Sequence, residues 1–125
     1  MDALDRLIAE AEAGASYALD VEIAQALVPQ IIVMRRNSDD TGNEPHTYRC
    51  FSTKLDDALW LGDALVPGCF WHVAKGRLTA SEPLFGCQLL FGADEVLAEG
   101  EGPTAPIAAL LAVLRARRAL GKEQP

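Results

Sequence analysis

The chain has few of the residues that usually build catalytic or metal sites. Its 125 residues include two histidines, His46 and His72, and three cysteines, Cys50, Cys69 and Cys87. No two cysteines form a Cys-x-x-Cys pair, and a zinc site or a Cys–His nucleophile pair needs several such groups at one point. We therefore expect free thiols in a reducing compartment, no metal, no cofactor and no catalytic residue.

Two spacings of these residues suggest other chemistry. Cys69 and His72 are three residues apart in an expected strand, so their side chains should point to opposite faces. His46 lies near Cys50 beside an expected loop, which leaves a Cys–His nucleophile pair open as an alternative. The simpler interpretation is that both histidines are surface or half-buried residues.

Long apolar runs are also missing. No run approaches the roughly 18 residues that a membrane-spanning helix needs. The segment Met1–Asp5 is acidic, whereas a secretory signal peptide begins with basic residues. We therefore expect no membrane partner and a cytoplasmic location.

Positive charge is scarce. Lysine and arginine together number 11 against 18 aspartates and glutamates, which gives a formal net charge of −7. Nucleic-acid binding needs basic side chains to neutralise phosphates, so we expect no nucleic-acid partner. The same balance suits a basic protein partner. Acidic residues gather in the segment 2–22 and in a second group formed by Asp94, Glu95, Glu99 and Glu101.

The remaining composition is typical of a folded domain. Half of the residues are apolar and fewer than a quarter are charged. A chain of this length buries roughly two thirds of the surface that its unfolded form exposes. That is enough for one core, so we expect a single domain over residues 1–125.

Apolar residues recur at helical spacing in four stretches, each of which begins near a residue that can cap a helix. The expected helices run from Asp2 to Gly14, from about Leu19 to Val28 after the cap Ser16, from the cap Ser52 to the Pro67-Gly68 turn, and over Thr104–Leu120 with Gly121 past the end.

Short apolar or β-branched runs predict strands at Ile31–Met34, Cys69–Ala74, Leu84–Phe91 and Val96–Ala98. The run Leu84–Phe91 is apolar on both faces, which is typical of a central strand, whereas the last run becomes polar and should lie nearer an edge. Residues 37–45 are polar and predict an exposed loop. The expected fold is α/β, with a small, mainly antiparallel sheet of three or four strands and helices packed on it.

The two tryptophans have different expected roles. Trp71 lies in an expected strand between Phe70 and Val73 and should belong to the core. Trp60 stands beside Leu61 and widens the apolar face of the third expected helix beyond a single core contact. Trp60 and Leu61 are therefore either ordinary packing residues or a patch that contacts a partner protein or a second copy of the chain.

The order of several motifs resembles a known family. Phe51–Leu59 precedes a Pro-Gly turn and a strand centred on Trp71, and Glu99–Glu101 then leads into a helix that opens over residues 102–110. Over about residues 17–120, this order resembles the phage ABA sandwich domain, a small group found in phages and prophages. The resemblance implies an α-β-α sandwich and a phage or prophage setting. It implies no established activity and no catalytic residue.

These observations favour a non-enzymatic phage or prophage accessory protein that acts through protein contacts inside the bacterial cell. An acidic inhibitor of a host protein is a sharper form of this hypothesis. A virion-associated structural component and a small enzyme with an unrecognised site remain as alternatives. The candidate partner-binding residues are Trp60, Leu61, Asp94, Glu95, Glu99 and Glu101, and the Trp60 face is also the candidate surface for a homo-oligomer.

Overall fold

The computed structural model describes residues 2–77, 83–91 and 95–123. Within these residues the chain forms four α-helices, one short 3₁₀ helix and five strands. In chain order they are α1 (Ala3–Ala13), α2 (Tyr17–Leu27), η1 (Pro29–Ile31), β1 (Val33–Arg36), β2 (Asn43–His46), α3 (Leu55–Leu65), β3 (Phe70–Arg77), β4 (Pro83–Phe91), β5 (Glu95–Gly102) and α4 (Ala105–Glu123).

The strands form two separate antiparallel sheets. We call the pair β1–β2 the hairpin and the sheet β3–β4–β5 the main sheet. In the main sheet β4 is the central strand and β5 lies at an edge, as the sequence predicts. Helices pack on this sheet, so the predicted α/β class with a small antiparallel sheet is confirmed.

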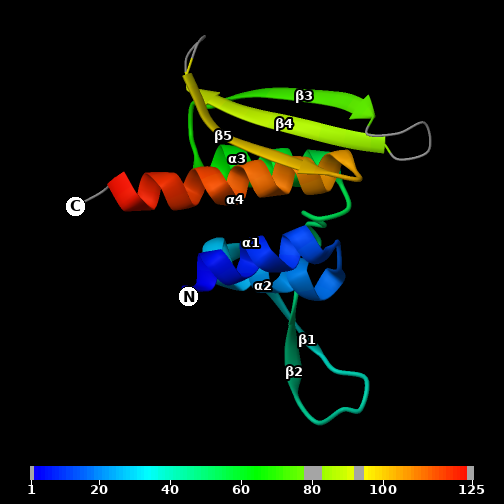
Figure 1. Ribbon diagram of the computed structural model, residues 1–125. Coiled ribbons are helices and arrows are strands. Elements are labelled where there is room, and N and C mark those ends of the chain that lie inside the picture. Colours follow the sequence, from blue (N-terminus) through cyan, green and yellow to red (C-terminus); the bar gives the residue numbers. More distant parts are fainter. Residues whose placement is uncertain (1, 78–82, 92–94, 124–125) are drawn as a thin grey trace.

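The layers follow one another from the main sheet to the hairpin. Helices α3 and α4 lie against one face of the main sheet, α1 and α2 lie beyond them, and the hairpin projects from the far end (Figure 1). Helix α4 contacts β5, β4, α3 and α1, so it joins the layers. None of the helices in the described part of the chain is long and apolar enough to cross a bilayer.

Two glycines let the main sheet and its helices approach closely. A Cβ atom at Gly100 of β5 would lie 2.2 Å from the carbonyl oxygen of Ala108 in α4, which is closer than real Cβ atoms come. At Gly62 of α3 a Cβ atom would lie 1.9 Å from the Trp71 ring. Trp71 packs against the core, as the sequence predicts.

The first two helices are capped by the residues that the sequence predicts. Asp2 accepts a hydrogen bond from the Asp5 amide, and Ser16 accepts one from the Leu19 amide. Side-chain acceptors at these positions satisfy amides that have no partner inside the helix. Helix α2 nevertheless starts at Tyr17, two residues earlier than predicted.

The predicted cap of the third helix is wrong. Helix α3 begins at Leu55, and its N-cap residue Lys54 makes no capping hydrogen bond. The Ser52 hydroxyl instead donates to the Ser16 carbonyl at 3.2 Å, and the Ser52 amide donates to the buried Asp20 carboxylate at 2.9 Å. Ser52 therefore ties the start of α2 to the segment before α3, a contact across 36 residues that helical spacing cannot reveal.

The hairpin corrects two further predictions. The strand expected at residues 31–34 lies at Val33–Arg36, and the loop expected over residues 37–45 contains strand β2 from Asn43. The turn between them is held by side chains, since the Asn37 carboxamide accepts from the Thr41 and Gly42 amides. The ladder forms although all four residues of β1 are exposed, because pairing satisfies the hydrogen bonds of the backbone.

The last helix is capped as predicted but is longer. The Thr104 hydroxyl accepts from the Ile107 amide at 3.4 Å. Helix α4 then continues to Glu123, so Gly121 lies inside the final turn and not past it. A glycine is tolerated there because the exposed end of a helix has little packing to lose.

Candidate protein-binding face

One face of the main sheet is turned away from the described helices. Alternate side chains of β3, β4 and β5 point toward α3 and α4, and the others point outward. We call the outward side the open face. Its main residues are Phe70, His72 and Ala74 of β3, Gly86, Gln88 and Leu90 of β4, and Val96, Glu99 and Glu101 of β5.

The first feature of the open face is a row of apolar side chains. Phe70 pairs with Leu90 across β3 and β4, and Leu90 pairs with Val96 across β4 and β5. Phe70 is 61% exposed and Val96 is 44% exposed, although both are large apolar residues. We call these three residues the apolar row. Leu90 is half-buried between these two exposed residues. A contiguous apolar group of this kind is typical of a surface that contacts another molecule.

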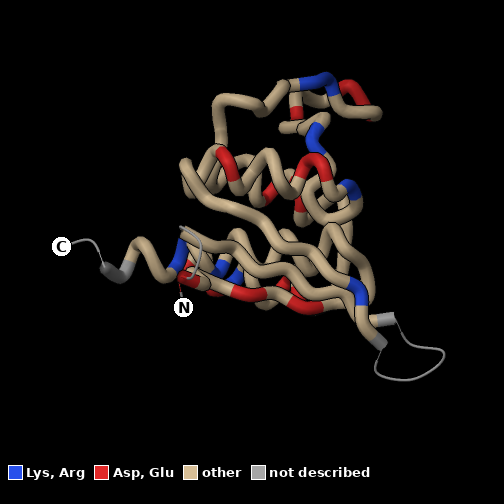
Figure 2. Tube along the Cα trace, turned by 90° about the horizontal axis from the view of Figure 1, so that it is seen from above, with Lys and Arg blue, Asp and Glu red and all other residues tan. Residues whose placement is uncertain are grey.

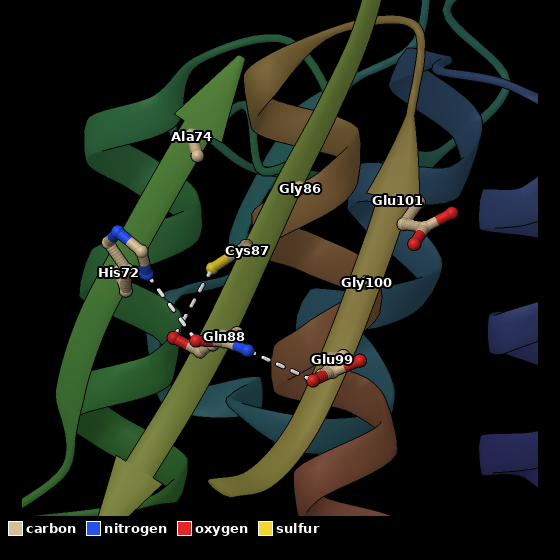
Figure 3. Close-up of a pocket in the computed structure, with 8 residues that line it drawn as sticks. All are labelled: His72, Ala74, Gly86, Cys87, Gln88, Glu99, Gly100 and Glu101. Carbon is tan, nitrogen blue, oxygen red and sulfur yellow. Dashed lines mark hydrogen bonds between the residues drawn. The ribbon is translucent and has the colours of Figure 1, made fainter. Parts of the chain in front are cut away.

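The second feature is a row of polar side chains that bond to one another. The His72 ring nitrogen Nδ1 lies 3.4 Å from Oε1 of Gln88, and Nε2 of Gln88 donates to Oε1 of Glu99 at 3.0 Å (Figure 3). The three residues come from three adjacent strands. Their hydrogen bonds hold the Glu99 carboxylate in place on the open face.

A depression of about 230 Å³ lies next to this polar row. His72, Ala74 and Gln88 line one side, and Glu99 and Glu101 line the other. Gly86 forms part of the lining (Figure 3), and a Cβ atom added there would meet nothing within 4 Å. The depression therefore exists because the middle strand carries no side chain at this point.

The open face is acidic along β5. Glu99 and Glu101 are exposed, and no basic side chain in the described part of the chain forms an ion pair with either. Figure 2 shows acidic positions following β5 at one edge of the sheet. Arg115 of α4 reaches this strand from the other side, where it donates to the backbone carbonyl of Glu99 at 2.9 Å and pairs with Glu12 at 3.8 Å.

The predicted partner-binding residues are only partly brought together. Glu99 and Glu101 lie side by side on the open face, Glu95 is exposed at the start of β5, and Asp94 lies outside the described residues. The prediction for Leu61 is wrong, because its side chain is 0% exposed in the core and cannot touch a partner.

Trp60 lies elsewhere, on α3. Its ring stacks on Phe51 with 6.4 Å between the ring centroids. The Arg49 guanidinium lies 4.2 Å from the centre of the same ring, and Arg49 also pairs with Asp57. Trp60 is therefore partly covered by its own chain, and its role in self-association stays a prediction.

The cysteines and histidines do not form a joint site in the described residues. His46 bonds to the Tyr17 hydroxyl at 2.9 Å, whereas the Cys50 thiol points to the Tyr48 carbonyl. Cys69 packs with the core. Cys87 points inward from β4, and burial raises the pKa of its thiol to about 11. A thiol with a raised pKa is a poor nucleophile at neutral pH.

Reasoning from the sequence missed the apolar row and Gln88. The run Leu84–Phe91 is apolar on both faces, which predicts a central strand but does not show that one of its faces is open to solvent. Gly86 and Gln88 lie on one of those two faces. A glycine and a polar residue on one face were the feature of the sequence that indicated an open face. The sequence did not indicate that Phe70 and Val96 are exposed, because their exposure depends on whether another element covers that face of the sheet.

Comparisons with known proteins give no relative for this chain. No family model, curated protein or solved structure matches it.

Proposed function

We propose that this protein is a non-enzymatic accessory protein of phage or prophage origin that binds another protein through the open face. The observation that carries the proposal is the apolar row, which exposes Phe70 and Val96 to solvent beside the carboxylates of β5. A binding surface commonly has this composition, with an apolar centre and a polar rim. The phage setting, within the cytoplasm of a bacterial host, rests on the family resemblance of the sequence.

The size of the depression favours a protein partner over a small-molecule substrate. Its volume of about 230 Å³ is smaller than the roughly 300–1,000 Å³ of common small-molecule sites. The depression also opens onto the broad surface formed by the apolar row. A side chain of a partner protein fits such a feature better than a whole metabolite does.

The test compares two sets of substitutions at exposed aromatic or apolar residues. The purified protein is immobilised, and its partners are captured from a bacterial lysate with the wild type, with Phe70→Ser/Val96→Ser and with Tyr48→Ser. Tyr48 is the matched control, since it is 71% exposed and lies outside the main sheet. We expect the double substitution to reduce capture of a specific partner roughly tenfold or more, and Tyr48→Ser to leave it unchanged.

Circular dichroism and urea unfolding check that all three proteins remain folded, as substitutions of exposed residues usually allow. If the folded double variant captures the same proteins in the same amounts as the wild type, the open face is not the binding surface. The proposal would then be wrong.

A further inference from the structure

We infer that the partner of the open face presents an extended segment with an apolar side chain on the apolar row and a lysine or arginine side chain in the depression over Gly86. This inference rests on the proposed function and names the chemistry of the partner. Charge complementarity, the shape of the depression and the spacing between the two features support it.

The negative charge around the depression favours a cationic side chain of the partner. Glu99 and Glu101 border the depression, and no lysine or arginine of the described residues lines it. The whole chain carries a formal charge of −7. A carboxylate pair that forms no ion pair with a described lysine or arginine attracts a basic side chain and repels a phosphate or a second acidic surface.

The row of polar side chains holds the Glu99 carboxylate in a position where it can bind a cationic side chain. Gln88 bonds to Oε1 of Glu99, and His72 in turn bonds to Gln88. A carboxylate has two oxygens that can each accept hydrogen bonds, so a guanidinium can bind the oxygen that Gln88 does not use. Because Glu99 is already held, little side-chain entropy is lost when the cation binds.

Arg115 shows how a guanidinium sits against the other side of β5. A second depression, of about 390 Å³, is lined by Glu99 and Glu101 from one side and by Glu12 and Arg115 from the other. Arg115 supplies a cation there and binds both Glu12 and the Glu99 carbonyl. The depression over Gly86 has the same two glutamates but no described arginine or lysine in its lining.

Spacing sets the pattern of the partner segment. The apolar row crosses β3 at Phe70, and the depression crosses it at Ala74, four residues along the same strand. At about 3.3 Å per residue these points are roughly 13 Å apart. An extended segment that runs along the strands presents residues i and i+4 on one face at the same distance. The partner therefore carries its apolar and basic side chains four residues apart.

The experiment uses two synthetic nine-residue peptides built on a serine and threonine background. One carries leucine and arginine four residues apart, and the other has the same composition with the two residues three apart, so that they face opposite sides. Binding to the ¹⁵N-labelled protein is followed by NMR titration. We expect the first peptide to bind about fivefold or more tighter than the second, with shifts at the amides of Gly86, Glu99 and Leu90.

Three protein variants assign the basic side chain to the depression. Gly86→Leu fills the depression, which has open space above Gly86, and keeps both carboxylates. Glu99→Gln/Glu101→Gln keeps the shape and removes the charge. We expect each to weaken binding of the first peptide about tenfold. Glu44→Gln removes an exposed carboxylate of β2 in the hairpin, away from the main sheet, and should change binding by no more than about twofold.

Each other outcome overturns the inference. If Gly86→Leu binds like the wild type, the depression is not the site, and if both peptides bind equally, the spacing is wrong. The unlabelled protein could also associate with itself, and Phe70→Ser/Val96→Ser could abolish that association. The occupant of the open face would then be a second copy of the chain, and the inference would be wrong. If these peptide results fail while partner capture still depends on Phe70 and Val96, the inference is wrong and the proposed function stands. If partner capture does not depend on Phe70 and Val96, the proposed function itself is wrong.

Discussion

The hairpin and the main sheet are both antiparallel ladders, but they have very different surroundings. All four residues of β1 are exposed, and the strands of the hairpin mainly contact each other. In the main sheet, Cys87 and Leu89 of β4 are buried on the side that faces α4. Backbone pairing therefore gives a strand its shape, whereas burial of one face gives it stability.

The open face extends the same comparison within one sheet. Leu89 of β4 is fully buried, while the neighbouring Leu90 belongs to the apolar row on the opposite side. One face of β4 therefore packs in the core, and its other face lies at the surface. Substitutions on the two faces, and in the hairpin, should have effects of very different size.

The largest effect is expected at Gly100, where β5 meets α4. Gly100→Leu would force a side chain into the backbone of α4, with its Cβ atom 2.2 Å from the Ala108 carbonyl oxygen and 2.6 Å from the Ala112 amide. Backbone cannot move aside as a flexible side chain can, so the free energy of unfolding should fall by about 3 kcal/mol or more. Urea unfolding measures it. Gly86→Ala on the open face is the control and should change stability by less than about 0.5 kcal/mol.

The second effect is a pH dependence that arises from Cys87. Its thiol has a pKa of about 11 in the folded protein, against 9.0 as the ordinary value, because burial disfavours the thiolate. Between these values the unfolded state loses its proton first, so stability falls as pH rises from 9 to 11, by on the order of 2 kcal/mol. Cys87→Ala should remove this part of the pH dependence, while Cys50→Ala should retain it. Equal pH profiles for wild type and Cys87→Ala would contradict the burial of the thiol.

A smaller effect is expected at the base of the hairpin. The Tyr17 hydroxyl bonds to Nδ1 of His46 and accepts from the Thr47 amide at 3.2 Å. Tyr17→Phe should lower the free energy of unfolding by about 1 kcal/mol, since it removes both hydrogen bonds. Amide exchange in β2 should become faster, with no change in β4. Unchanged exchange in β2 would mean that Tyr17 does not hold the hairpin.

The smallest effect is expected in the hairpin itself. Met34 is 58% exposed, so Met34→Ala should change the free energy of unfolding by less than about 0.5 kcal/mol. Hydrogen exchange of the unaltered protein provides a second measurement, in which amides of residues 37–45 should exchange faster than those of β4. Strong protection of this segment would show that the hairpin is as stable as the main sheet and would remove the contrast between them.

Local patterns in the sequence predicted much of the fold but less of the candidate site. The caps Asp2, Ser16 and Thr104 and the central position of β4 follow from residues a few positions apart. The role of Ser52 could not be predicted in this way, because its hydrogen-bond partners Ser16 and Asp20 lie more than 30 residues away in the sequence. Of the predicted site, Glu99 and Glu101 lie on the open face, whereas Leu61 lies in the core.

Residues that lie close together along the chain specify the helices and the strands of the main sheet, and the composition alone specifies the excess of acidic charge. Caps, periodicity and composition act over one or two turns or strands, so they can be read along the chain. Which apolar residues are covered depends instead on how the helices and strands pack on one another. Leu61 and Phe70 are similar in hydrophobicity, but α3 turns Leu61 into the core and no described helix covers Phe70. Burial depends on the neighbours that distant parts of the chain supply, and that is what makes the open face a property of the fold.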